Sequence, residues 1–232
     1  MRISQEQVSL LALCQIRGVD WNLLAREAQR PGGLERLLAG EVTEGTPEAA
    51  QTAEFITEAR DKLDHHRQAV LEEVSRAEGV GAGLVTVLDK GYPRTLRLIF
   101  NLPPFLFVQG RLLEQDLRSV AVVGTRQPTD PGLQRAKQMA RLLTDAGVTV
   151  VSGLARGIDT AAHQATLERS GRTIAVVGTG ITAATPRRTP NWPHGSLRRG
   201  RWCPSSGRAH HRPPGRSPAA TPPCRGSPRA RW

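Results

Sequence analysis

The feature that most constrains the fold is a strand–loop–helix unit that occurs twice between residues 119 and 181 and is followed by a third strand. The apolar runs have the length and composition of buried strands in a parallel sheet: Val120–Val123, Val148–Val151 and Thr173–Val177. Helical patterns at 130–145 and 160–169 connect them. This alternation predicts an α/β fold built on an incomplete Rossmann-like parallel sheet. In the first helix we expect an inward stripe of Leu133, Ala136, Met139, Ala140 and Leu143.

Residues 1–78 are expected to form a separate small helical module. Asp20 and Thr46 are suitable helix caps, and Pro47 suits a first helical position, opening a polar helix that could run to about Arg76. Such a module can pack on nucleic-acid backbones or serve as a structural accessory, and the sequence leaves both interpretations open. Glycines at 79, 81 and 83 then open a second domain over 79–181.

Two glycine-containing loops follow the first two strands. Parallel strands bring such loops to one edge of the sheet, where glycines allow close approach of a phosphate and helix starts supply N–H groups. Arginine adds a forked charge to each loop. The predicted phosphate-binding residues are Gly124, Thr125, Arg126, Ser152, Gly153, Arg156, Gly157 and Asp159. Neither loop has the G-x-G-x-x-G pattern and there is no P-loop, so ordinary βα turns remain the alternative.

No catalytic, metal or cofactor site is predicted. Asp159 and His163 are four residues apart, but one carboxylate and one imidazole are too few ligands for a metal. We expect this Asp to cap the helix or orient loop N–H groups, and the His to pack nearby. No Ser/His/Asp set or acidic pair stands out before residue 182, and Cys14 is expected to be a buried apolar residue.

These loop residues also carry a family resemblance. The sequence resembles the DNA-processing protein A (DprA/Smf) family over about residues 92–181. The segments concerned are Tyr92–Pro93, Pro103–Gly110, Val122–Thr129, Gly132, Val150–His163 and Gly171–Ile181. Over the helical N-terminus the resemblance is looser, and in the family this part is often a sterile-alpha-motif or helix-hairpin-helix-like module.

The resemblance implies a cytoplasmic, non-enzymatic protein of natural transformation that binds single-stranded DNA. The family protects incoming strands and loads the recombinase RecA onto them, usually as a homodimer. It places Arg126 in the DNA-binding pocket and lines that pocket with Ser152–Asp159. Lys137 and Arg141 either extend the basic surface or form a solvated helix face.

The formal charge of +11 comes entirely from residues 182–232, which hold eleven Arg and no Asp, Glu or Lys. The resemblance ends at Ile181. Synonymous codons can be chosen for Thr185–Gly207 so that the same DNA, translated in the frame one base earlier, encodes an amphipathic helix and a strand. This recoded segment is like the family's continuation. We therefore expect a disordered, frameshifted tail. A basic nucleic-acid-binding arm and a zinc site at Cys203, His210, His211 and Cys224 are the alternatives.

A frameshift would leave a truncated product with an exposed sheet edge and bare apolar surface, without most of the family's dimerisation and RecA-contact surfaces. We expect such a product to be unstable or inactive. Alternatives are an enzyme of a related Rossmann family that acts on nucleotide phosphates, and a non-functional pseudogene product. The polar start lacks the apolar core of a signal peptide, and no membrane span is expected, which predicts a cytoplasmic location.

Overall fold

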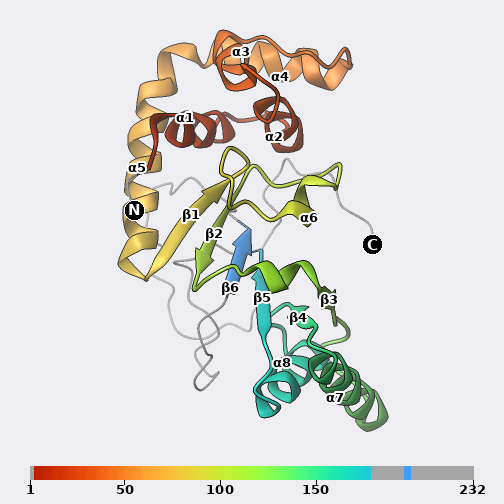
Figure 1. Cartoon of the computed structure of the whole chain (residues 1–232). Helices are drawn as coiled ribbons and strands as arrows, with labels where there is room; N and C mark the ends of the chain where they lie inside the picture. The colour runs from red at the N-terminus through yellow and green to blue at the C-terminus, as the bar shows by residue number, and fades with distance from the viewer. Residues whose placement is uncertain (1–2, 179–195, 200–232) are drawn as a thin grey trace, which may run out of the picture. The chain divides into compact units, whose positions relative to one another are not determined.

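The computed structural model describes residues 3–178 and the backbone of 196–199. Its centre is a six-stranded sheet in the order β1-β2-β6-β5-β4-β3 (Figure 1). The strands are β1 Ala82–Thr86, β2 Phe105–Gln109, β3 Ser119–Ala121, β4 Thr149–Ser152, β5 Thr173–Val177 and β6 Ser196–Arg199. Neighbours from β3 to β6 are parallel, whereas β2 is antiparallel to both β1 and β6. The predicted α/β class and the parallel order of the three predicted strands are confirmed.

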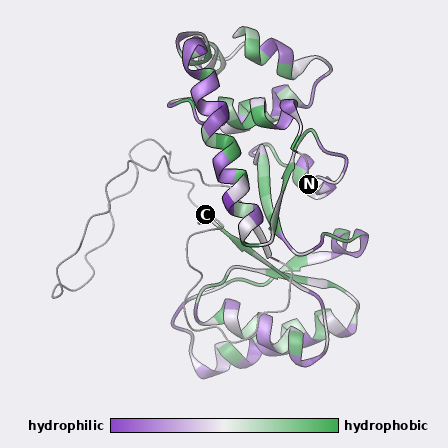
Figure 2. Ribbon diagram, turned by 90° about the vertical axis from the view of Figure 1, so that its left-hand side faces the viewer, coloured by the Kyte–Doolittle hydropathy of each residue, from purple (hydrophilic) through white to green (hydrophobic). Residues whose placement is uncertain are grey.

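Two helices connect the parallel strands and lie on the same side of them (Figure 2). They are α7, Asp130–Asp145, and α8, Ile158–Glu168. Thr129 caps α7 by accepting a hydrogen bond from the Gly132 N–H at 3.3 Å, and Gly147 ends the turn after α7 with φ +67°. Small side chains on both helices, among them Ala140, Ala162 and Ala165, let them pack closely over Val150.

Two details of the predicted sheet are wrong. The strand expected at Val120–Val123 to be buried ends at Ala121, and Val120 and Val123 are 43% and 67% exposed. Among the described strands β3 is at the edge of the sheet and pairs with β4, and Val123 already lies in the loop that follows it. Met139, expected inside, is 52% exposed because Ala136 and Ala140 occupy the buried side of α7.

The tail was expected to lack regular structure, but Ser196–Arg199 forms β6 between β2 and β5. Backbone groups at the free edges of two strands can recruit a third strand whatever its side chains, so an apolar pattern was not required. The other parts of the tail, and with them the suggested zinc ligands, lie outside the described residues.

The N-terminal part is helical, as predicted. Its helices are α1 Gln5–Cys14, α2 Trp21–Ala28, α3 Gly33–Ala39, α4 Pro47–Glu58 and α5 Leu63–Gly79, with a 3-10 turn η1 at Arg60–Lys62. Asp20 and Thr46 accept hydrogen bonds from Asn22 N–H and Ala49 N–H, which confirms both caps. The single helix expected from Thr46 to about Arg76 is divided at η1, and the break lets apolar residues of both α4 and α5 reach one core.

The buried side chains form two clusters. The larger joins α1–α5 to the β1–β2 hairpin and includes Cys14, whose predicted burial is confirmed. The smaller lies between α7, α8 and β4. The apolar core of the helical module therefore continues through residue 108, beyond the boundary expected at residue 78. None of the described helices has the length and apolar content needed to cross a membrane.

Candidate functional site

The two glycine loops meet at the carboxyl ends of β3 and β4. Loop 1 is residues 122–129 and loop 2 is residues 153–157. The Ile158 N–H donates to the Thr125 carbonyl at 3.2 Å, and the Ser152 hydroxyl donates to the Val122 carbonyl at 2.6 Å. The first bond joins the start of α8 to loop 1. The second joins the end of β4 to the first residue of loop 1. The eight predicted site residues therefore lie in one connected cluster.

Glycine is required sterically where the loops touch. Gly157 has φ +91°, and a Cβ atom there would lie 2.3 Å from the Thr125 carbonyl oxygen. A Cβ at Gly124 would lie 2.7 Å from Cγ1 of Ile158. Both distances are below any real Cβ contact, so these glycines allow the loops to approach each other. Sequence reasoning missed Ile158, since an apolar helix-start residue carries no signal of such a contact.

Several of the polar groups expected to face a phosphate are instead hydrogen-bonded to other groups of the protein. Asp159, 6% exposed, accepts a hydrogen bond from the Gly124 N–H at 3.3 Å. Ser152 is 2% exposed and bonded to Val122. The Gly124 N–H and the Ile158 N–H are thus already paired, and Asp159 places a negative charge beside them. An incoming phosphate would depend more on cationic side chains than on these N–H groups.

His163 braces loop 2 from within α8. It is fully buried, with Nε2 2.6 Å from the Gly153 carbonyl oxygen and Nδ1 2.7 Å from the Thr173 hydroxyl. Because a carbonyl oxygen only accepts, Nε2 carries a hydrogen and donates to it. Burial lowers the pKa of His163, although the Gly153 bond and the Asp159 carboxylate oppose this shift. Thr173, the partner on β5, gave no signal in the sequence.

Two arginines remain available to a ligand. Arg126 in loop 1 and Arg156 in loop 2 are both exposed. Within residues 3–178, neither guanidinium makes a hydrogen bond or an ion pair. On α7, by contrast, Arg141 is paired with Glu168 at 2.9 Å, which leaves it less able to extend a basic surface. The cluster thus presents two forked cations on a rigid frame.

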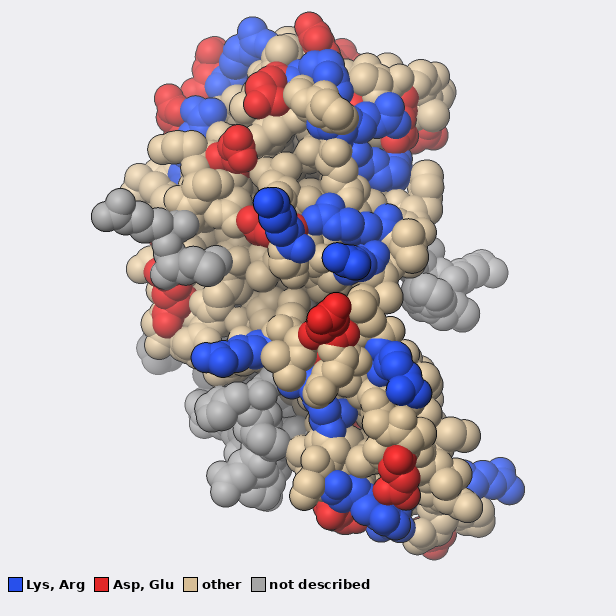
Figure 3. Space-filling model, viewed as in Figure 1, with Lys and Arg blue, Asp and Glu red and all other residues tan. Residues whose placement is uncertain are grey.

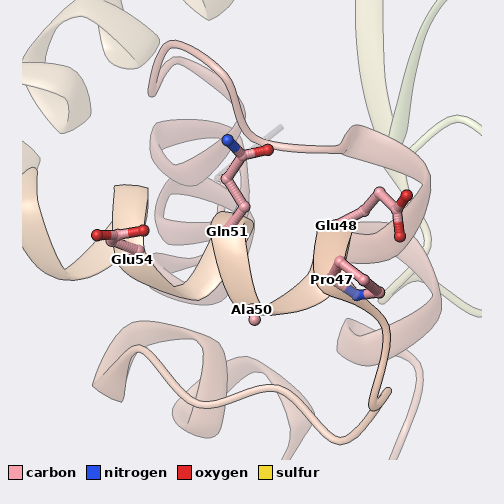
Figure 4. A pocket seen from close by; sticks show the side chains of 5 residues that line it. All are labelled: Pro47, Glu48, Ala50, Gln51 and Glu54. Atoms are coloured by element: carbon pink, nitrogen blue, oxygen red, sulfur yellow. The ribbon is translucent and has the colours of Figure 1, made fainter.

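A separate hollow on α4 shares no residue with these loops. It is lined by Pro47, Glu48, Ala50, Gln51 and Glu54, and Figure 4 shows its two carboxylates. Its acidic lining is unsuited to an anionic ligand, so the loop cluster is the better candidate site.

Comparison with known sequences decides the family. The sequence model of DNA recombination-mediator protein A matches residues 83–201, slightly more than half of the chain. The chain belongs to this family. The matched range contains residues 92–181, over which the resemblance was found, and extends beyond both ends of it.

The chain is also similar to proteins named Smf and DprA. Protein Smf of Synechocystis sp. is 37% identical over 193 residues, which cover 79% of this chain and 46% of that protein. DNA processing protein DprA of Streptococcus pneumoniae is 41% identical over 102 residues, 44% of this chain and 36% of the relative. The chain spans less than half the length of these two relatives.

A solved structure shares the fold. The X-ray structure of DNA processing protein A from Streptococcus pneumoniae aligns with a TM-score of 0.55 and 27% identity, covering 81% of this chain and 62% of that one. The aligned share of this chain is larger than its Rossmann-like part alone. The assignment to a DNA-processing family therefore rests on sequence and on fold.

Proposed function

We propose that this chain binds single-stranded DNA through the cluster of loops 1 and 2, with Arg126 and Arg156 contacting backbone phosphates. The observation that carries the proposal is a pair of exposed guanidinium groups, without a hydrogen bond or ion pair within residues 3–178, on two loops that a hydrogen bond joins. Contacts of this kind hold phosphates without reading bases, as a protein that accepts any single strand requires. The proposed role is binding, without a covalent step or a cofactor.

Membership of the DNA recombination-mediator family supports a wider role. In that role the protein acts in the cytoplasm during natural transformation, protects incoming strands and loads RecA onto them as a homodimer. This part is tested by measuring whether the purified chain speeds nucleation of RecA filaments on an oligonucleotide coated with single-strand-binding protein. An unchanged nucleation rate would remove RecA loading from the proposal.

The binding proposal is tested by titrating a labelled oligothymidylate with the wild-type chain and with Arg126→Gln and Arg156→Gln. Each substitution should weaken binding by about 5- to 10-fold, because a charge-assisted phosphate contact is lost. Arg135→Gln is the control, since Arg135 is exposed on α7 outside both loops. Equal affinity of all four proteins would refute the site. Release of free base from nucleoside monophosphates would favour the nucleotide-cleaving alternative.

A further inference from the structure

An exposed aromatic ring lies away from the loop cluster, after the short helix α6, Arg94–Arg97. Phe100 is 75% exposed, and the Arg26 guanidinium lies over its ring, 4.1 Å from the centroid. Burial of a ring this large normally stabilises a protein, so exposing it forgoes that stabilisation. Neither the fold nor the proposed loop site explains why the ring is presented to solvent.

The group behind the ring is held in a fixed position. Arg26 on α2 makes two hydrogen bonds to the Glu44 carboxylate, 2.7 Å from Nε and 2.8 Å from Nη2, and a third to the Phe100 carbonyl oxygen at 3.2 Å. The bond from Arg26 holds the pKa of Glu44 below its usual value, although burial opposes this shift. The Arg26 guanidinium is therefore already fixed behind the ring. A group that stacks on the other face of Phe100 would cost little further side-chain entropy at Arg26.

The segment between β1 and β2 that carries the ring also carries three cations. Lys90 and Arg94 are exposed and, within the described residues, make no hydrogen bond or ion pair. Arg97 donates to Gln29 Oε1 and to the carbonyl oxygens of Val87 and Asp89, which are neutral acceptors, and it forms no ion pair with any described residue. Figure 3 shows Lys and Arg gathered over α2 and α6 on this face. Protein-binding patches are usually depleted of lysine, so this composition favours a polyanion.

We propose that Phe100, backed by Arg26, is a stacking platform for an unpaired base of single-stranded nucleic acid, with Lys90, Arg94 and Arg97 contacting the adjacent phosphates. The ring offers a π-face to any base, and the cations supply the charge that a backbone needs. This inference rests on the proposed single-strand binding but adds a second contact, on the segment between β1 and β2, with Arg26 of α2 behind it. It gives this segment and α2 a role in binding rather than in support alone.

The test uses the full chain, an oligothymidylate and an abasic oligonucleotide of the same length. Phe100→Leu removes the ring but keeps an apolar side chain, and Phe100→Trp keeps a stacking surface. We expect Phe100→Leu to weaken oligothymidylate binding roughly 5- to 100-fold and Phe100→Trp to bind like the wild type. Leu98→Ala, a change at a side chain that is 86% exposed, is the matched control and should leave affinity unchanged.

The two oligonucleotides separate stacking from charge. On the abasic strand Phe100→Leu should equal the wild type, whereas Lys90→Gln with Arg94→Gln should reduce the salt dependence on both strands, by about 0.7 in log–log slope per lost phosphate contact. Equal loss on both strands, or none on either, overturns the platform. If Phe100→Leu has no effect while Arg126→Gln weakens binding, the loop site stands alone. Failure of the wild-type chain to bind either strand overturns both proposals.

Discussion

At the scale of single residues, the geometry of loop 2 depends on polar side chains that are almost completely buried. Asp159 and His163 lie one turn apart on α8; the first accepts the Gly124 N–H and the second donates to the Gly153 carbonyl. A buried polar group that loses its partner costs about 1–3 kcal/mol, so these bonds also resist rearrangement of the loop. The exposed arginines are thus carried on a frame whose own polar groups are largely satisfied.

Gly157→Ala tests the contact between the loops. The new Cβ would meet the Thr125 carbonyl oxygen at 2.3 Å and a backbone with φ +91°, so we expect a loss of about 2–4 kcal/mol in the free energy of unfolding. Gly147→Ala is the matched control: its φ is +67°, but nothing lies within 4 Å of the new Cβ. It should lose only about 1 kcal/mol. Denaturant unfolding of both variants makes the comparison, and equal losses would mean that the loops are not in contact.

His163 should make stability depend on pH. Its pKa is lowered in the folded state, chiefly by burial, so below about pH 6.5 the unfolded chain binds more protons than the folded one. The free energy of unfolding should therefore fall as pH decreases from 6.5 to the folded-state pKa, by up to about 1.4 kcal/mol per pH unit.

The measurement is the difference in unfolding free energy between wild type and His163→Gln across pH 5 to 8. Burial also lowers the pKa of His66, beside His65 and Lys62, but that contribution is present in both proteins and cancels in the difference. A difference that does not vary with pH would show that His163 keeps an ordinary pKa.

At the scale of elements, an ion pair ties the segment before β3 to the start of β5. Arg172 donates to both carboxylate oxygens of Asp116, which lies in the 3-10 turn η2, Glu114–Leu117. Burial alone would raise the pKa of Asp116, but hydrogen bonds from Arg172 and the Leu113 N–H hold it below its usual value. Both side chains are mostly covered, with 21% and 12% exposed, so solvent screens the pair little.

Arg172→Ala should therefore lower the free energy of unfolding by about 1–3 kcal/mol, since Asp116 would keep its charge without its main partner. Arg169→Ala is the control, because the pair of Arg169 with Asp145 is about half exposed and should contribute less than about 0.5 kcal/mol. Chemical denaturation distinguishes them. A larger loss for Arg169→Ala would contradict the account of which pair stabilises the sheet.

The sequence predicted elements best where the pattern was local. Caps at Asp20 and Thr46, both helices between the parallel strands and the three strands themselves follow from side-chain periodicity and turn residues. The exposure of Met139 and Val123 was not predicted by this pattern, because it depends on which elements cover each face of the helix and each edge of the sheet. The insertion of β6 depends on backbone groups of β2 and β5, which no side-chain pattern reveals.

The candidate site was predictable to a similar extent. Strand ends and glycines indicated which loops would meet, since parallel strands bring their carboxyl ends to one edge. Two contacts could not be predicted, because they depend on three-dimensional distances. They are the hydrogen bond from the Gly124 N–H to Asp159 and the contact of His163 with Thr173. The sequence therefore locates the two arginines but not the reason why they, rather than backbone N–H groups, are left for a ligand.

At the scale of the whole molecule, charge and function are separate questions. The net charge of +11 comes from residues 182–232, whereas the proposed phosphate contacts at Arg126 and Arg156 lie in the earlier part of the chain, where charges balance. Local placement of cations on a rigid frame would then determine binding, with the tail adding non-specific attraction. The two contributions can be separated, because each phosphate contact changes the salt dependence of binding by a defined amount.

The most direct test is the salt dependence of oligothymidylate binding by the full chain and by the Arg126→Gln, Arg156→Gln double variant. If the loop cluster holds the strand, the double variant should bind roughly 25- to 100-fold more weakly, with a log–log salt slope reduced by about 1.4, equivalent to two lost phosphate contacts. If affinity and slope are both unchanged, the strand is held by the tail or by another surface, and the proposed site is wrong.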